Sequence, residues 1–256
     1  SILNFKKVAL SGSFLKKSQI KLEKKYPLSI AVCEKCKHLQ IQNIINPKKL
    51  FNHYEWETGV SKSNFELISS LLNTLKKKFK LNQKSKVFEI ASNDGTLLKE
   101  VKTRFKSFVL GIDPAKNIAE IANKNGIKTL PEFFNYKCAK KIINNNTKAD
   151  IVFARNVIPH VKDIHSIIRG MSELLSAEGT AIIEFHYAKI IQDELHYDSI
   201  YHEHLFYFTI KTLTNLCEKY NLHAYDVDKS PISGGSLVLY FSKKKLKQKK
   251  KLIDLV

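Results

Sequence analysis

Residues 86–113 read KVFEIASNDGTLLKEVKTRFKSFVLGID, and this stretch decides the fold. VFEI and FVLGI are short apolar runs typical of buried strands, and TLLKEVKTRF between them has helical spacing. The alternation continues downstream, where we expect strands at IKTL (127–130), ADIVFARN (149–156) and TAIIEFHY (180–187). Strands that alternate with helices predict βαβ units and a mostly parallel sheet.

The end of this region predicts a change of strand direction. HAYDVD (223–228) and SLVLYF (236–241) flank the turn-rich PISGG, which favours an antiparallel pair. Before them, Thr209 can cap a helix over residues 210–220. Five parallel strands that finish in such a pair describe an α/β fold, the Rossmann-like sheet of class I methyltransferases.

The chain divides into three regions. Residues 1–61 are irregular and predict a small N-terminal zinc-binding or substrate module, whereas residues 62–242 hold the predicted methyltransferase sheet. Residues 243–256 are basic and read as a lead into a missing C-terminal domain. We therefore expect a fragment that is cut at both ends.

The 256 residues carry a formal net charge of +19 at neutral pH, which raises the question of a nucleic-acid partner. The lysines are spread over the whole chain, and no arginine-rich stripe or RNA-binding aromatic motif accompanies them. A solvated surface is the favoured interpretation, and attraction of a phosphorylated small molecule is the second. No apolar run is long enough to cross a bilayer, and four cysteines form no disulfide framework, so we expect a cytoplasmic protein without a membrane partner.

EIASNDG (Glu89–Gly95) ends the first strand, at the sheet edge where open α/β sheets bind ligands. Asp113 ends the second strand, about twenty residues later, where an acid can accept both hydroxyls of an adenosine ribose. A plain turn and a helix N-cap are the alternatives for the loop and the acid. His160, after the fourth strand, is equally well explained as a loop histidine. The predicted cofactor-binding residues are Glu89, Ala91, Ser92, Asn93, Gly95, Asp113 and Asn156.

Cys33 and Cys36 form a CxxC pair, which is half of a tetrahedral zinc site. His38 and His53 could complete the site, although two ligands upstream of Ser1 are the favoured completion. The surrounding YPLSIAVCEKCKHLQIQ alternates like a strand pair.

LHYDSIYHEHLFYF (195–208) concentrates three histidines, two acids and five aromatic residues. Histidine takes or gives a proton near neutral pH with little tuning, so acid–base chemistry beside a bound cofactor is the favoured interpretation. One alternative is a metal site, with ligands drawn from His196, Asp198, His202 and His204. The other alternative is a buried aromatic cluster with incidental histidines.

Together, these motifs resemble a known family. EIASNDGTLL, GIDPAKNIA, ARNVIPH and above all YDSIYHEHLFYF followed by PISGGSL are similar to the C-methyltransferases that act on nucleoside-diphosphate deoxysugars. Family members carry an N-terminal zinc module with two CxxC pairs, a central methyltransferase domain and a C-terminal α/β domain. The resemblance implies S-adenosylmethionine (SAM) as cofactor, Zn²⁺ at the Cys33–Cys36 half-site, and a nucleotide-sugar substrate.

The resemblance also implies a mechanism. A base removes the acidic proton next to the carbonyl of a 4-keto sugar, and the enolate carbon attacks the methyl group of SAM. His204 is then the base, Glu203 binds the sugar or orients the histidine, and Tyr201 supplies a hydroxyl near the developing oxyanion. Tyr54 lies in NHYEWETGVS, which resembles a family segment that lines the active site, and Trp56 stands where a second tyrosine is common.

Two other functions stay open. An RNA-binding or RNA-modifying protein could use the same sheet with its basic surface, and a zinc-stabilised scaffold could keep the fold without activity.

Overall fold

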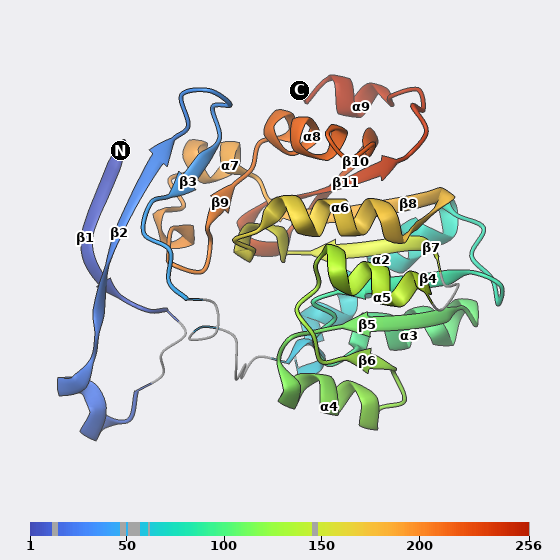
Figure 1. The fold of residues 1–256 in the computed structure, drawn as a ribbon, viewed down its shortest axis with the longest axis horizontal. Coiled ribbons are helices and arrows are strands. Elements are labelled where there is room, and N and C mark those ends of the chain that lie inside the picture. Colours follow the sequence, from blue (N-terminus) through green and yellow to red (C-terminus); the bar gives the residue numbers. More distant parts are fainter. Residues whose placement is uncertain (12–14, 47–49, 51–56, 61, 145–147, 256) are drawn as a thin grey trace.

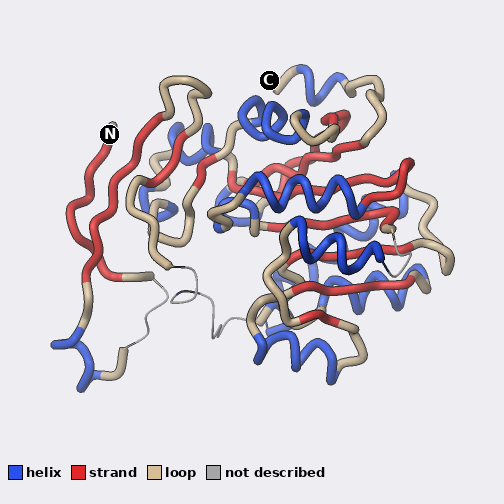
Figure 2. Tube along the Cα trace, viewed as in Figure 1, coloured by secondary structure: helices blue, strands red, loops and turns tan. Residues whose placement is uncertain are grey.

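The computed structural model describes residues 1–11, 15–46, 50, 57–60, 62–144 and 148–255. These residues form a seven-stranded sheet and a four-stranded sheet, and the smaller sheet lies to one side of the larger (Figure 1). In Figure 2 the strands of the large sheet form one layer, with helices on both of its faces.

The large sheet has the strand order β10–β11–β8–β7–β4–β5–β6. Neighbouring strands from β6 to β8 run parallel, whereas β11 runs antiparallel to both β8 and β10. This topology confirms the predicted α/β sheet and its closing antiparallel pair. The strands are β4 (Lys86–Ile90), β5 (Phe108–Ile112), β6 (Thr129–Leu130), β7 (Ala149–Arg155), β8 (Leu175–His186), β10 (His223–Ser230) and β11 (Ser236–Ser242).

Alternating side chains of the strands give the sheet two apolar faces. Val87 and Phe153 pack with helices α2 and α3, and Phe88 and Val152 pack with α5, α6 and α8 on the opposite face. Because both faces are covered by helices, the strands read as nearly continuous apolar runs. The helices of this region are α2 (Lys62–Lys78), α3 (Thr96–Phe105), α4 (Lys116–Lys124), α5 (Tyr136–Asn144), α6 (Ile164–Leu174), α7 (Ala188–Asp193) and α8 (Ile210–Glu218).

Side-chain caps set the start of two helices. The carboxylate of Asp163 accepts a hydrogen bond from the Ser166 amide at 3.1 Å, and the Thr209 hydroxyl accepts one from the Thr212 amide at 3.1 Å. Each cap satisfies an amide that the helix itself leaves unpaired. The Thr209 cap is the one that the sequence predicts.

The small sheet joins the N-terminal residues to a late part of the chain. Its order is β1 (Leu3–Ala9), β2 (Lys25–Val32), β3 (Leu39–Ile41) and β9 (Phe206–Tyr207), all antiparallel. Leu28, Ile30 and Ile41 form a separate apolar cluster with Leu205 and Tyr207. The histidine-rich segment is therefore anchored on the N-terminal sheet. Short helical turns occupy Lys17–Leu22, Thr58–Val60, Ile158–His160, Tyr197–Ser199 and Ile232–Gly234.

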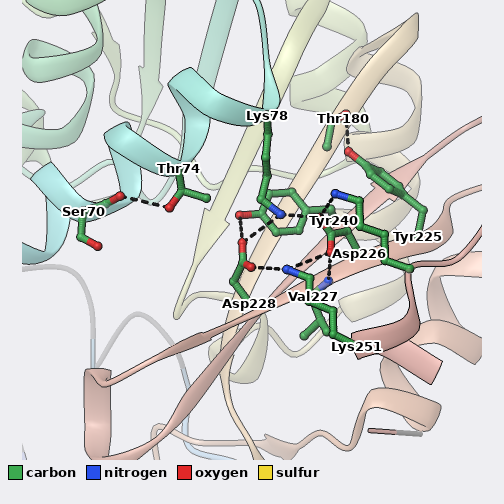
Figure 3. A network of polar contacts seen from close by, with 11 residues as sticks. Ser70, Thr74, Lys78, Thr180, Tyr225, Asp226, Val227, Asp228, Tyr240 and Lys251 are labelled. Carbon is green, nitrogen blue, oxygen red and sulfur yellow. Dashed lines mark hydrogen bonds and ion pairs between the residues drawn. The ribbon is translucent and has the colours of Figure 1, made fainter. Parts of the chain in front are cut away.

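A buried ionic cluster ties the C-terminal helix α9 (Lys250–Ile253) to the sheet (Figure 3). Asp226 on β10 is fully buried and pairs with Lys78 of α2, with Lys249 at 2.7 Å and with Lys251 at 3.0 Å. Its neighbour Asp228 accepts a hydrogen bond from the Tyr240 hydroxyl at 2.7 Å. The cluster joins α2, β10, β11 and α9 on the face opposite α5 and α6.

Within the described ranges, no helix is both long enough and apolar enough to cross a membrane.

Candidate active site

A cleft of about 820 Å³ opens at the carboxyl ends of β4, β5, β7 and β8. Its walls come from the loops after these strands and from the histidine-rich segment that follows α7. Its volume suits a cofactor together with a small substrate, and its position is where open α/β sheets bind ligands.

The loop after β4 is held in an unusual backbone conformation. Ala91, Asn93 and Gly95 all have left-handed φ values, of 54°, 50° and 78°. A Cβ atom on Gly95 would also lie 3.0 Å from Ile127, so glycine fits this position for two reasons. A strained backbone of this kind persists only where the surrounding residues hold it in place.

Asp113 helps to hold this loop in its conformation. One carboxylate oxygen accepts a hydrogen bond from the Asn93 amide at 2.9 Å, and the other accepts one from the Ala115 amide at 2.9 Å. Burial raises the pKa of this carboxyl, while the two amides lower it. Asp113 thus joins the ends of β4 and β5, and it also lines the cleft. Helix α4 begins at Lys116, with Ala115 rather than Asp113 as its N-cap.

At the end of β4, two buried polar groups that line the cleft lack partners among the described residues: Oε2 of Glu89 and the hydroxyl of Ser92. Burial raises the pKa of Glu89 to about 8, against the lowering effect of Arg155, whose guanidinium donates to Glu184 at 2.8 Å. Unpaired buried polar atoms cost free energy unless a ligand or water meets them. These atoms therefore fit a polar ligand.

Thr58 and Gly59 cover the same loop from the N-terminal side. The Thr58 amide donates to Oδ1 of Asn93 at 2.9 Å, and the Gly59 amide donates to Oδ2 of Asp94 at 2.7 Å. Thr58 also lines the cleft. No local sequence pattern predicts this contact, because it links residues 35 positions apart.

Tyr201 and His204 form a hydrogen-bonded pair in the cleft. The Tyr201 hydroxyl lies 2.9 Å from Nε2 of His204, and Nδ1 of the same ring lies 2.8 Å from the Ser199 carbonyl oxygen. A carbonyl oxygen only accepts, so Nδ1 carries the proton and Nε2 accepts from Tyr201. Burial lowers the pKa of His204, while the Ser199 carbonyl raises it. His204 is thus a neutral imidazole whose basic nitrogen lies beside the Tyr201 hydroxyl.

Other titratable groups surround this pair. The His160 ring centre lies 4.8 Å from that of His204, and burial, followed by the closeness of this second imidazole, lowers the pKa of His160 to about 3. Burial raises the pKa of Glu203. His160, Glu203 and His204 all line the cleft.

Leu205 fixes this segment between the two sheets. Its amide donates to the Pro159 carbonyl oxygen at 2.8 Å, and its own carbonyl oxygen accepts from the Ile41 amide at 3.0 Å. The buried His202 places Nε2 3.1 Å from the Pro27 carbonyl oxygen, so this ring anchors the segment to β2. Across the ranges that the structure describes, no group of three metal-ligating side chains is present, which gives the metal alternative for this segment no support.

Cys33 and Cys36 lie in a tight turn between β2 and β3, outside the cleft. The Cys33 amide donates to the His38 carbonyl at 2.9 Å, and the left-handed Lys37 donates its amide to the Cys33 carbonyl at 2.8 Å. Hydrogen bonds from Cys36 lower the pKa of Cys33. The turn presents two thiols, whereas no third ligand joins them among the residues described here.

His38 is not placed as the third ligand. Its ring packs 4.5 Å from the ring of Phe208, with both nitrogens buried, and burial lowers its pKa to about 4. His53 lies outside the described residues, as do Tyr54 and Trp56.

Most of the predicted site residues come together in the one cleft. It is lined by Glu89, Ala91, Ser92, Asn93, Asp113, Asn156, Tyr201, Glu203 and His204. Gly95 shapes the loop without lining the cleft. The roles of these residues stay predictions. Thr58, Arg155 and His186 also line the cleft, although no sequence motif marks them as site residues.

Comparisons with known proteins agree with this architecture. Residues 60–227 match the family model described as a methyltransferase domain, and residues 1–51 match a zinc binding domain. The chain is 30% identical over 240 residues to the C-methyltransferase NovU of Streptomyces niveus, and the match covers 93% of this chain and 57% of NovU. The chain thus spans little more than half the length of that relative.

Solved structures show the same fold at low identity. PH0226 from Pyrococcus horikoshii OT3 has a TM-score of 0.58 and 15% identity, over 77% of this chain and 98% of that one. Magnesium protoporphyrin IX methyltransferase (ChlM) from Synechocystis PCC 6803, solved with bound SAM, has a TM-score of 0.52 and 12% identity, over 69% of this chain and 78% of that one. Since the methyltransferase model matches more than half of its length, the chain belongs to the methyltransferase domain family and has the class I SAM-dependent fold.

Proposed function

We propose that this protein methylates the carbon next to the keto group of a nucleotide-linked deoxysugar, with SAM as the methyl donor. The Tyr201–His204 pair carries this proposal, because a basic nitrogen and a hydroxyl share one cleft with the predicted cofactor loop. The 30% identity to a C-methyltransferase supports transfer to carbon, and the bound SAM of ChlM supports the donor.

The residues at the carboxyl ends of β4 and β5 fit SAM. Glu89 and Ser92 offer unpaired buried oxygens, and Asp113 fixes the loop that carries Asn93. A buried carboxyl whose pKa is about 8 becomes ionised when a cationic ligand is bound beside it. When bound, SAM supplies an electrophilic methyl group.

Residues of the histidine-rich segment, which lies between α7 and β9, would act on the sugar. Nε2 of His204 takes the acidic proton, and its low pKa keeps the imidazole unprotonated and ready at neutral pH. The Tyr201 hydroxyl then donates to the carbonyl oxygen as negative charge develops there. Glu203, which lines the cleft, would bind the sugar hydroxyls or orient His204, and Tyr54 is a further predicted contributor.

We further propose that residues 1–61 form a zinc module and that residues 62–242 form the catalytic domain. Cys33 and Cys36 would supply two of four zinc ligands. Zinc then stabilises the turn between β2 and β3, since neither thiol lines the cleft.

Methyl transfer tests the proposal directly. The purified protein is incubated with dTDP-4-keto-6-deoxyglucose and SAM that carries a ¹³C-labelled methyl group. We expect a new carbon-bound methyl signal by NMR at the carbon next to the keto group. A methyl group found on oxygen or nitrogen, or no transfer to the sugar under conditions where SAM binds, would contradict the proposal.

A further inference from the structure

His186 is a buried histidine that the proposed mechanism does not use. It is the last residue of β8, pairs across the sheet with Ser236 of β11, and lines the cleft. The side chain is buried, with 7% of the residue exposed, and both ring nitrogens lack a hydrogen-bond partner among the described residues. Burying an unpaired imidazole reduces the stability of the fold unless a group in the cleft forms a hydrogen bond with it.

Burial keeps His186 uncharged. It is the main cause that lowers the pKa of His186 to about 4; the nearby imidazoles of His204 and His196 lower it further, while Asp198 raises it. The His196 ring centre lies 5.9 Å away. A neutral imidazole has one nitrogen that donates and one that accepts, which suits a hydroxyl better than an anion.

The place of His186 in the sheet separates it from the cofactor loop. In the sheet, β7 lies between β8 and β4. His186, at the end of β8, is therefore one strand removed from the Glu89 loop at the end of β4. His204 and Tyr201 line the same cleft as His186. A polar group that forms a hydrogen bond with His186 therefore belongs to the methyl acceptor rather than to the methyl donor.

His38 shows that burial alone does not explain His186. Its nitrogens also lack partners among the described residues, yet its ring packs against Phe206 and Phe208 and does not line the cleft. His38 thus serves as an aromatic packing residue, whereas His186 lines a cavity of about 820 Å³.

We infer that a ring nitrogen of His186 hydrogen-bonds a hydroxyl group of the acceptor sugar, so that His186 selects acceptors that carry this hydroxyl. The inference rests on the proposed function. A site with a buried polar group discriminates strongly against an analogue that leaves the group unpaired, because the desolvated nitrogen is then exposed to an apolar neighbour.

The test compares acceptors within one enzyme preparation. Values of kcat/KM are measured for dTDP-4-keto-6-deoxyglucose and for its 2-deoxy and 3-deoxy analogues, and their ratio does not depend on the fraction of folded enzyme. We expect the wild type to disfavour one analogue by about 100-fold, a typical loss for an unpaired buried group. His186→Phe should bring that ratio close to unity, and His186→Asn, which keeps a donor and an acceptor, should retain a ratio of about 10.

His38→Phe is the matched control, because it removes another imidazole whose ring nitrogens are buried and lack partners among the described residues, and it should keep the wild-type ratio. SAM affinity, measured by calorimetry, should be the same in all variants. Equal use of all three acceptors by the wild type, or a wild-type ratio in His186→Phe, would overturn the inference while leaving the proposed function intact. No turnover of any of the three by the wild type would contradict the proposed function and the inference with it.

Discussion

The Tyr201 hydroxyl donates a hydrogen bond to Nε2 of His204 across 2.9 Å, and the Ser199 carbonyl fixes the ring from its other nitrogen at 2.8 Å. The Ser199 carbonyl therefore sets the tautomer of His204, and the Tyr201 hydroxyl occupies the basic nitrogen Nε2. A bound acceptor must replace this hydrogen bond before a proton can move to Nε2. The hydroxyl released in this way becomes available to the carbonyl oxygen of the acceptor.

Tyr201→Phe should lower kcat for methyl transfer by about 100-fold, because it removes a donor aimed at the developing oxyanion. SAM affinity should not change, since the tyrosine belongs to the acceptor half of the cleft. Tyr220→Phe is the matched control: the Tyr220 hydroxyl also contacts a histidine, His165, at 2.8 Å, but outside the cleft. Steady-state kinetics would contradict this role if both variants kept wild-type kcat.

Asp113→Ala should weaken SAM binding by about 10-fold and lower the free energy of unfolding by about 2 kcal/mol. The variant loses two hydrogen bonds to backbone amides that hold the cofactor loop. Asp150→Ala offers a control, since Asp150 accepts from the Lys86 amide at 2.9 Å and lies outside the cleft. Calorimetry should show unchanged SAM affinity in the control, and equal affinities in both variants would argue against the assigned role of Asp113.

Asp226→Asn should reduce stability in a pH-dependent way. Burial opposes ionisation of Asp226, but Lys249, Lys78 and Lys251 outweigh it and lower the pKa to about 2 from its ordinary 3.8. A lowered carboxyl pKa stabilises the fold above the ordinary pKa, and this stabilisation is lost as the pH falls toward the folded value. We expect a loss of about 2 kcal/mol in the variant at pH 7, shrinking below about pH 4.

Denaturant unfolding of the wild type and the variant between pH 7 and pH 3 measures this difference. Asp193→Asn removes a single exposed pair with Lys189 and should change stability by less than about 0.5 kcal/mol. A difference that is as large at pH 3 as at pH 7 would show that the cluster does not act through the charge of Asp226.

Replacing both Cys33 and Cys36 by serine should reduce the zinc content of the purified protein to background. Zinc binds thiolates, and these two thiols are exposed enough to reach a metal ion. Cys138→Ala should leave the zinc content unchanged, because burial raises the pKa of that thiol on α5. Elemental analysis that finds equal zinc in all three proteins would rule out the pair as ligands.

The parallel part of the large sheet could be predicted from sequence because short apolar runs alternate there with segments of helical period, and its antiparallel pair because the turn-rich PISGG separates β10 from β11. The Thr209 cap could be predicted as well, since a cap acts within three residues. The predicted cofactor loop and Asp113 also line one cleft, as expected for residues at the carboxyl ends of the neighbouring strands β4 and β5.

Other features depend on contacts through space that no local pattern encodes. β9 has two residues, too few for a period to be visible, yet it brings the histidine-rich segment onto the N-terminal sheet. The anchoring of His202 on Pro27 joins residues 175 positions apart. His186 ends a strand that is otherwise apolar, and its unpaired nitrogens emerge only when the cleft around it is known.

Deuterium exchange tests the central claim most directly. The wild type and His204→Asn are incubated in D₂O with dTDP-4-keto-6-deoxyglucose, and NMR follows loss of the proton next to the keto group. The wild-type enzyme should exchange this proton for deuterium, whereas His204→Asn should not. His204→Asn should still bind SAM with normal affinity. The control variant His165→Asn should exchange the proton at the wild-type rate. Exchange by His204→Asn at the wild-type rate would show that His204 is not the base.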